Sequence, residues 1–144
     1  MKTRKQVVVD SSVIIKWVNS QDENLLKHAD NILKDTEKEK IEIFAPELAK
    51  YEIGNALLNK KMELSTTKVS LSTVYAIPIT FIPLDEVSAK HTMEIAWKSG
   101  ITYYDASFIA LAEKLKAEII TDNPKHLKKS LTTEAKVVAL KDYK

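Results

Sequence analysis

Residues 6–18 read Gln-Val-Val-Val-Asp-Ser-Ser-Val-Ile-Ile-Lys-Trp-Val, a short β-branched run that passes through an aspartate into a stretch of helical spacing. The valines predict a buried strand, and the apolar residues after Ser12 recur at the spacing of one helix face. A strand that leads directly into a helix is the first half of a βαβ unit, which builds parallel sheets. We therefore expect an α/β fold.

The same alternation of short apolar runs and helical stretches continues to the end of the chain. It predicts a five-stranded parallel sheet flanked by helices, with strands at 6–9, 41–44, 79–82, 118–121 and 136–139. The expected helices are 12–18, 23–38, 46–62, 66–76, 86–98, 103–116 and 124–129. Because no repeat or linker interrupts the pattern, we expect residues 1–144 to form a single domain.

The composition excludes several classes of function. A length of 144 residues fits one globular domain, and a net charge of +2 is too small to indicate nucleic-acid binding by itself. Cysteine is absent, so disulfides, thiol nucleophiles and cysteine-bound metals are excluded. Only two glycines occur, which excludes glycine-rich phosphate and dinucleotide loops. The apolar stretch 75–84 is too short to span a bilayer and the chain start lacks a signal-peptide core, so we expect a cytoplasmic protein.

Two acids follow predicted strands directly. Asp10 ends the first strand and Asp122 ends the fourth, at the carboxyl edge of the sheet where open α/β folds bind their ligands. Asp10 also precedes a helix, so a simple N-cap is the alternative interpretation. That alternative is weaker for Asp122, because Asn123 before Pro124 is the better cap.

A third acid falls on an apolar helix face. Projection at about 100° per residue places Glu52 between Leu48 and Ala56, with Asn55 and Asn59 on nearly the same stripe. A buried carboxylate is costly unless it is paired or binds a metal. A salt bridge to a lysine is the alternative interpretation.

A fourth acid, Asp105, lies in the first turn of its predicted helix, beside an apolar stripe that includes Tyr104 and Phe108. A capping arrangement with Thr102 is the alternative here. All four acids are expected at one edge of the sheet, where their mutual repulsion would raise some pKa values unless cations neutralised them. Since only oxygen ligands are available, the sequence predicts Mg²⁺ or Mn²⁺.

Three segments carry a resemblance to a known family. At residues 9–17, 46–57 and 104–112 the sequence resembles the PIN-domain family and, within it, the VapC-type toxin ribonucleases of toxin–antitoxin pairs. The resemblance implies a PIN-like three-layer sandwich and a metal-dependent endoribonuclease that hydrolyses RNA phosphodiester bonds. It also implies a homodimer and a cognate antitoxin partner. The family's first three acids and their supporting polar groups correspond here to Asp10, Glu52 and Asp105, with Ser11 or Ser12 and Asn55.

The fourth acid of the family corresponds less cleanly. Family members commonly show Thr, any residue and Asp at the end of the fourth strand, whereas this chain has Thr121, Asp122 and Asn123. Either Asp122 or Asn123 is therefore the expected fourth ligand. We assign Asp10 and Asp105 to direct metal binding, Glu52 to metal positioning or water deprotonation, and Asp122 to a second ion or its waters.

Lysines are the expected phosphate contacts, because the chain has a single arginine. The candidates near the acidic edge are Lys16, Lys125, Lys128 and Lys129, with Trp17 or Tyr103 as stacking surfaces. A solvated lysine or a core aromatic is the alternative for each of them.

Three competing functions have weaker support. A metal-dependent phosphohydrolase for small phosphate esters is one, but Asp10 is followed by two serines and lacks the DxD nucleophile pattern. A receiver-type signalling domain would need an acidic pair after the first strand. A non-catalytic RNA-binding PIN scaffold is the third, against which the intact acids argue.

Overall fold

A computed structural model describes residues 3–19, 25–128 and 135–144 of the chain. Its strands are β1 (Lys5–Val9), β2 (Ile41–Pro46), β3 (Ile79–Ile82), β4 (Glu118–Thr121) and β5 (Val137–Ala139). Its helices are α1 (Ser11–Val18), α2 (Leu26–Glu37), α3 (Ala49–Asn59), α4 (Leu64–Ala76), α5 (Glu86–Ser99), α6 (Tyr103–Leu115) and α7 (Pro124–Lys128), followed by the 3-10 helix η1 (Leu140–Asp142).

The strands form one parallel sheet in the order β3-β2-β1-β4-β5. The strand β1 therefore lies in the middle, between β2 and β4. Its register with β4 pairs Val9 with Ile120, and the backbone N–H of Asp10 donates to the Ile120 carbonyl at 2.9 Å. This register brings the acids after β1 and β4 to adjacent strand ends.

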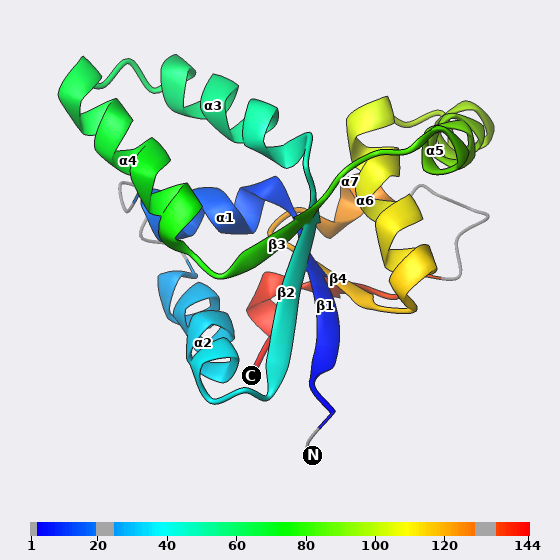
Figure 1. The fold of residues 1–144 in the computed structure, drawn as a ribbon, viewed down its shortest axis with the longest axis horizontal. Helices are drawn as coiled ribbons and strands as arrows, with labels where there is room; N and C mark the ends of the chain where they lie inside the picture. Colours follow the sequence, from blue (N-terminus) through cyan, green and yellow to red (C-terminus); the bar gives the residue numbers. More distant parts are fainter. Residues whose placement is uncertain (1–2, 20–24, 129–134) are drawn as a thin grey trace.

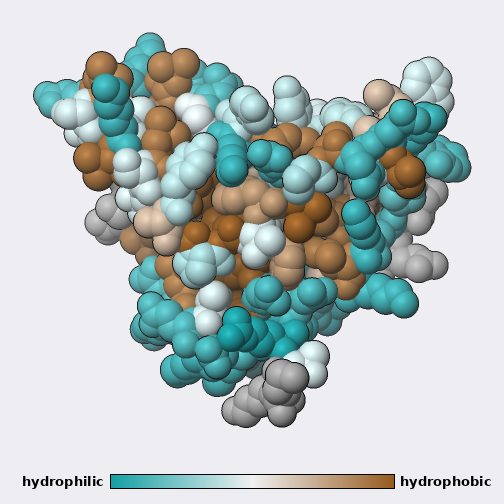
Figure 2. Space-filling model, viewed as in Figure 1, coloured by the Kyte–Doolittle hydropathy of each residue, from teal (hydrophilic) through white to brown (hydrophobic). Residues whose placement is uncertain are grey.

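Helices cover both faces of the sheet, which gives the predicted three layers. The helices α1 and α2 contact one side, α5 and α6 pack against each other on the other, and α3 and α4 pack on α1 (Figure 1). The strand ends open upward in Figure 1 between the α3–α4 arm and the α5–α6 arm, and the space-filling view is hollowed between the same two arms (Figure 2). The expected α/β fold with a five-stranded parallel sheet is confirmed.

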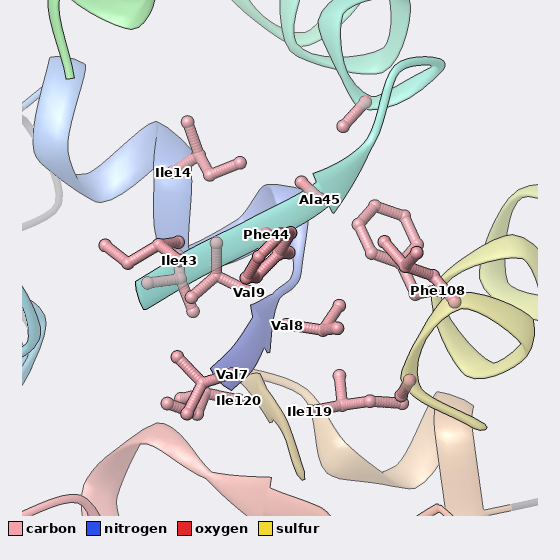
Figure 3. Close-up of a cluster of buried hydrophobic side chains, with 14 of the residues drawn as sticks. Val7, Val8, Val9, Ile14, Ile43, Phe44, Ala45, Phe108, Ile119 and Ile120 are labelled. Atoms are coloured by element: carbon pink, nitrogen blue, oxygen red, sulfur yellow. The ribbon is translucent and has the colours of Figure 1, made fainter. Parts of the chain in front are cut away.

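The core explains why apolar and polar residues do not alternate along the central strand. The residues Val7, Val8 and Val9 are all buried, because helices cover both faces of the central strand. Ile43 and Ile120 flank them from the neighbouring strands, and Phe108 reaches the core from α6 (Figure 3).

Most element boundaries lie within one or two residues of the expected ones, and the larger differences concern two helices. The helix expected at 46–62 begins only at Ala49, because Pro46 still belongs to β2 and pairs with Ile82. The helix expected at 23–38 begins at Leu26, because Leu25 is its N-cap with a left-handed backbone (φ 63°); residues 20–24 lie outside the described ranges. Residue 129, expected in the last helix, lies outside them too. Among the described helices, none combines the length and apolar character that a membrane span requires.

Candidate functional site

Asp10 lies where β1 passes into α1, in the N-cap position of the helix. Its side chain makes no cap hydrogen bond, so the simple N-cap interpretation is wrong. Instead the Oδ2 atom accepts hydrogen bonds from the Ser12 hydroxyl at 2.9 Å and from the Thr121 hydroxyl at 2.8 Å. The carboxylate is thereby oriented by one group from its own helix and one from the adjacent strand end.

The same two hydroxyls organise the end of β4. The Ser12 hydroxyl accepts the backbone N–H of Asp122 at 3.1 Å, and the Thr121 hydroxyl accepts that of Asn123 at 3.1 Å. These bonds connect the two strand ends through side chains as well as through the sheet.

Glu52 reaches the site from the first turn of α3. Its Oε1 atom accepts a hydrogen bond from the Ser11 hydroxyl at 3.0 Å. Within the described ranges the partner of Glu52 is thus a serine hydroxyl and not the lysine that the alternative interpretation required. Asn55 is exposed and lines, together with Glu52, a surface hollow of about 350 Å³.

Asp105 lies in the first turn of α6, partly buried. Its backbone N–H donates to the Thr102 hydroxyl at 3.0 Å, so the cap that the sequence suggested is formed. The cap does not exhaust the role of this residue, because its carboxylate lies close enough to Asp10 and Glu52 for its charge to act on both.

Burial and mutual repulsion raise the pKa values of two of the acids. Burial is the main cause for Asp10; the hydrogen bonds from Thr121 and Ser12 oppose it, and the charge of Asp105 adds to it. Burial also raises the pKa of Glu52; the Ser11 hydrogen bond opposes this, and the charges of Asp10 and Asp105 add to it. Three carboxylates from distant parts of the chain therefore share one electrostatic field.

Asp122, the fourth acid, is paired with a lysine. The Lys16 ammonium lies 3.4 Å from the Asp122 Oδ2 atom, and the lysine side chain is only 3% exposed. Lys16 was expected as a phosphate contact, and the structure buries its side chain beside Asp122.

A family model for the PIN domain matches residues 7–130, which include all four acids. The chain belongs to the PIN domain family. The resemblance found in the sequence is thus confirmed for the family, and the carboxyl edge described above is that of a PIN domain.

Solved structures of similar fold include several toxin–antitoxin proteins. A DNA-bound VapBC from Salmonella typhimurium superposes on 96% of this chain and over 99% of its own chain, with 14% sequence identity and a TM-score of 0.70. PAE2754 from Pyrobaculum aerophilum superposes on 96% of this chain and over 93% of its own chain, with 23% sequence identity and a TM-score of 0.66. VapC20 from Mycobacterium tuberculosis, described as a Sarcin-Ricin loop cleaving toxin, superposes on 81% of this chain and over 87% of its own chain. The sequence identity is 13% and the TM-score is 0.60. At these identities the likeness concerns the fold, and no curated protein sequence matches the chain.

The donor chemistry of this PIN domain fits a hard divalent cation. Its acids offer only oxygen, and the raised pKa values of Asp10 and Glu52 are those that a nearby cation would lower. Their present hydrogen bonds run to hydroxyl groups, and no three acids or histidines within the described ranges stand together as a formed metal site.

Of the residues expected to contact nucleic acid, Trp17 is packed on the core and Lys125 is accessible. Trp17 packs on the core and its indole N–H donates to the Ala29 carbonyl at 2.8 Å, so its role is structural. Lys125 is exposed and lines, with Asn123, a hollow of about 470 Å³. The side chain of Lys128 and all of Lys129 lie outside what the structure describes.

Two exposed aromatic residues were missed. Tyr51 is 77% exposed and Tyr104 is 53% exposed, and both line the hollow beside Glu52. The predicted apolar stripe includes Tyr104, which is wrong because the structure leaves this side chain 53% exposed. A usable signal was present, since each tyrosine directly precedes a site acid in the sequence.

Proposed function

We propose that this PIN domain is a metal-dependent endoribonuclease and the toxin of a toxin–antitoxin pair. The observation that carries the proposal is that the hydroxyls of α1 and β4 hold the carboxylates of Asp10 and Glu52 at the carboxyl edge of the sheet, where burial and nearby acids raise both pKa values. Burying ionised carboxylates close together costs free energy, and their presence therefore favours a cation-dependent reaction over a purely structural role. The toxin assignment is supported by the VapBC and VapC proteins that share the fold.

Asp10 and Asp105 would hold Mg²⁺ or Mn²⁺ directly, and Glu52 would position a water or accept its proton. When bound, the ion would supply an activated water and positive charge for phosphodiester hydrolysis. The hydroxyls of Ser12 and Thr121 would keep the Asp10 carboxylate oriented, and the Ser11 hydroxyl would do so for Glu52. Such outer partners matter because they fix the geometry of the ligands.

RNA would approach along the exposed carboxyl edge. Tyr51 and Tyr104 stand beside Glu52 and offer exposed rings on which a base could stack. Lys125, near Asn123, offers a charge for a phosphate on the other side of the site.

The proposed partners are an antitoxin and a second copy of the chain, acting in the cytoplasm with RNA. Apolar side chains remain uncovered on the α3–α4 arm and on α5, where a protein partner would bury them. They are Tyr51, Leu58, Leu64, Val69 and Tyr75 on the first, and Val87, Met93 and Trp97 on the second.

The test is an RNA cleavage assay with the purified full chain. We expect cleavage of single-stranded RNA with Mg²⁺ or Mn²⁺ and none after addition of a chelator. Cleavage that persists in the chelator would refute the metal dependence. RNA binding without cleavage would indicate the non-catalytic scaffold, and hydrolysis of p-nitrophenyl phosphate alone would indicate the small-ester phosphohydrolase.

A further inference from the structure

The lysine of α1 is buried in an unusual place for its residue type. Lys16 has a side chain that is 3% exposed, although lysines are almost never fully buried unless they are paired. It follows Asp10 by six residues, so its Cα lies roughly 9 Å from that of Asp10 along the helix axis. Helical side chains lean toward the N-terminus, and the long lysine stem thus carries the ammonium back to the carboxyl edge of the sheet.

At that edge the ammonium meets the Asp122 carboxylate at 3.4 Å. A buried lysine without a carboxylate would be strongly unfavourable, and Asp122 supplies a carboxylate to Lys16. The pair is joined to the remaining site, because the Ser12 hydroxyl bonds both the Asp122 backbone N–H and the Asp10 carboxylate.

The net charge of the site then limits how many cations it can hold. At their formal charges the four acids Asp10, Glu52, Asp105 and Asp122 carry four negative charges. The positive charge of Lys16 reduces the sum to three negative charges. One divalent ion reduces this to a single negative charge, whereas a second would make the site positive. A fixed ammonium also repels any cation that approaches the oxygen it contacts.

We propose that the Lys16 ammonium is the permanent counter-charge of Asp122, so that the site takes up one divalent ion, at the Asp10 group, and none at Asp122. This inference rests on the proposed function and narrows it, since Asp122 becomes a positioning residue that fixes the end of β4 through its pair with Lys16. It replaces both the phosphate-contact role expected for Lys16 and the second-ion role expected for Asp122.

The test counts the Mn²⁺ ions bound per chain, by equilibrium dialysis with metal analysis, in the full-length protein. We expect one ion in the wild type, in Lys16→Arg, which keeps the charge, and in Asp122→Asn. We expect two in Lys16→Met, which has similar length but no charge, and one again in the double variant Lys16→Met with Asp122→Asn. Circular dichroism establishes that each variant is folded.

Two ions in the wild type, an unchanged count of one in folded Lys16→Met, or no ion in Asp122→Asn would each overturn the inference. Should Lys16→Met not fold, Lys16→Gln, which is uncharged but polar, takes its place with the same expected count of two ions. A Lys16→Met protein that loses RNA affinity with an unchanged ion count would show a phosphate contact instead. A wild type that cleaves RNA with two ions refutes only this inference, whereas one that binds no ion and cleaves no RNA refutes the proposed function as well.

Discussion

The carboxyl group of Asp10 is subject to opposing influences. Burial and the charge of Asp105 raise its pKa, while the hydroxyls of Thr121 and Ser12 stabilise its ionised form. A residue held in this way lowers the stability of the metal-free protein and becomes favourable when a cation arrives. Its location was predictable, because the end of a strand is a local property of the sequence, whereas its partner Thr121 is 111 residues away and depends on the strand order.

Replacement of Asp10 by asparagine should separate activity from folding. Because changes to the outer partners of a metal cost about 10–100-fold, loss of a direct ligand should reduce RNA cleavage by at least about 100-fold. The amide keeps the shape of the carboxylate without its charge, so the melting temperature of the chelator-treated protein should equal or exceed that of the wild type. Cleavage assays and thermal denaturation check this, with Asp105→Asn expected to lose cleavage likewise. Substantial activity in either folded variant would contradict the assignment.

The stability of the metal-free protein should depend on pH through Asp10 and Glu52. Both pKa values are raised in the folded state, so the unfolded chain releases these protons first as the pH rises above the ordinary values of 3.8 and 4.5. The contribution of these groups to the free energy of unfolding should therefore decrease as the pH rises through the folded-state values. Urea denaturation in chelator, from pH 4 to 7, should show a smaller decrease in Asp10→Asn than in the wild type. An equal decrease in the two proteins would argue against the raised pKa of Asp10.

At the scale of elements, each acid is positioned by where its helix or strand begins or ends. Asp105 is held by the cap of α6, Glu52 by the first turn of α3, and Asp122 by the end of β4. Helical periodicity predicted Glu52 on the inner side of its helix, and the structure has it partly buried and bonded to Ser11. The start of α3 was missed because the pairing of Pro46 with β3 is a long-range contact. The burial of Lys16 was missed for a similar reason, since the sequence shows a helix face and not what packs on it.

The cap of α6 should affect both stability and the site. Thr102→Ala removes the acceptor of the Asp105 N–H and should reduce the free energy of unfolding by about 1 kcal/mol. It should also weaken Mn²⁺ binding, because Asp105 sits in the turn that the cap fixes. The matched control is Asp85→Ala, which removes the cap of α5 formed with the Ser88 N–H at 2.8 Å. Urea denaturation should show a similar loss for both variants, and isothermal titration should show weaker Mn²⁺ binding only for Thr102→Ala; weakening in both would point to general loosening.

At the scale of the whole molecule, two arms rise on either side of the acidic edge and leave apolar side chains uncovered (Figure 2). The class of fold followed from the alternation of strands and helices, but the strand order did not, because local patterns carry no information on which strands are neighbours. The larger uncovered set lies on the α3–α4 arm, which is thus the better candidate for contact with a second copy.

A charge placed on that arm should therefore disrupt the proposed dimer. Leu58 is 70% exposed on α3, and Leu58→Asp should shift the purified chain from dimer to monomer in size-exclusion chromatography with light scattering. The control is Trp97→Asp on α5, where the side chain is 84% exposed and the substitution should leave the mass unchanged. Both variants should fold, since exposed substitutions usually change stability by less than about 0.5 kcal/mol. Dissociation by Trp97→Asp alone would place the contact on α5 instead.

The central place of β1 affects how the protein is made. The strand β1 is synthesised long before its neighbour β4. The Ile120 carbonyl of β4 accepts the backbone N–H of Asp10, and the Thr121 hydroxyl donates to the Asp10 carboxylate. A nascent or prematurely terminated chain that stops before residue 118 lacks these partners and Asp122 as well. Asp10 thus lacks its bond from Thr121 until a further 111 residues have been synthesised, and the proposed site cannot form before β4 does.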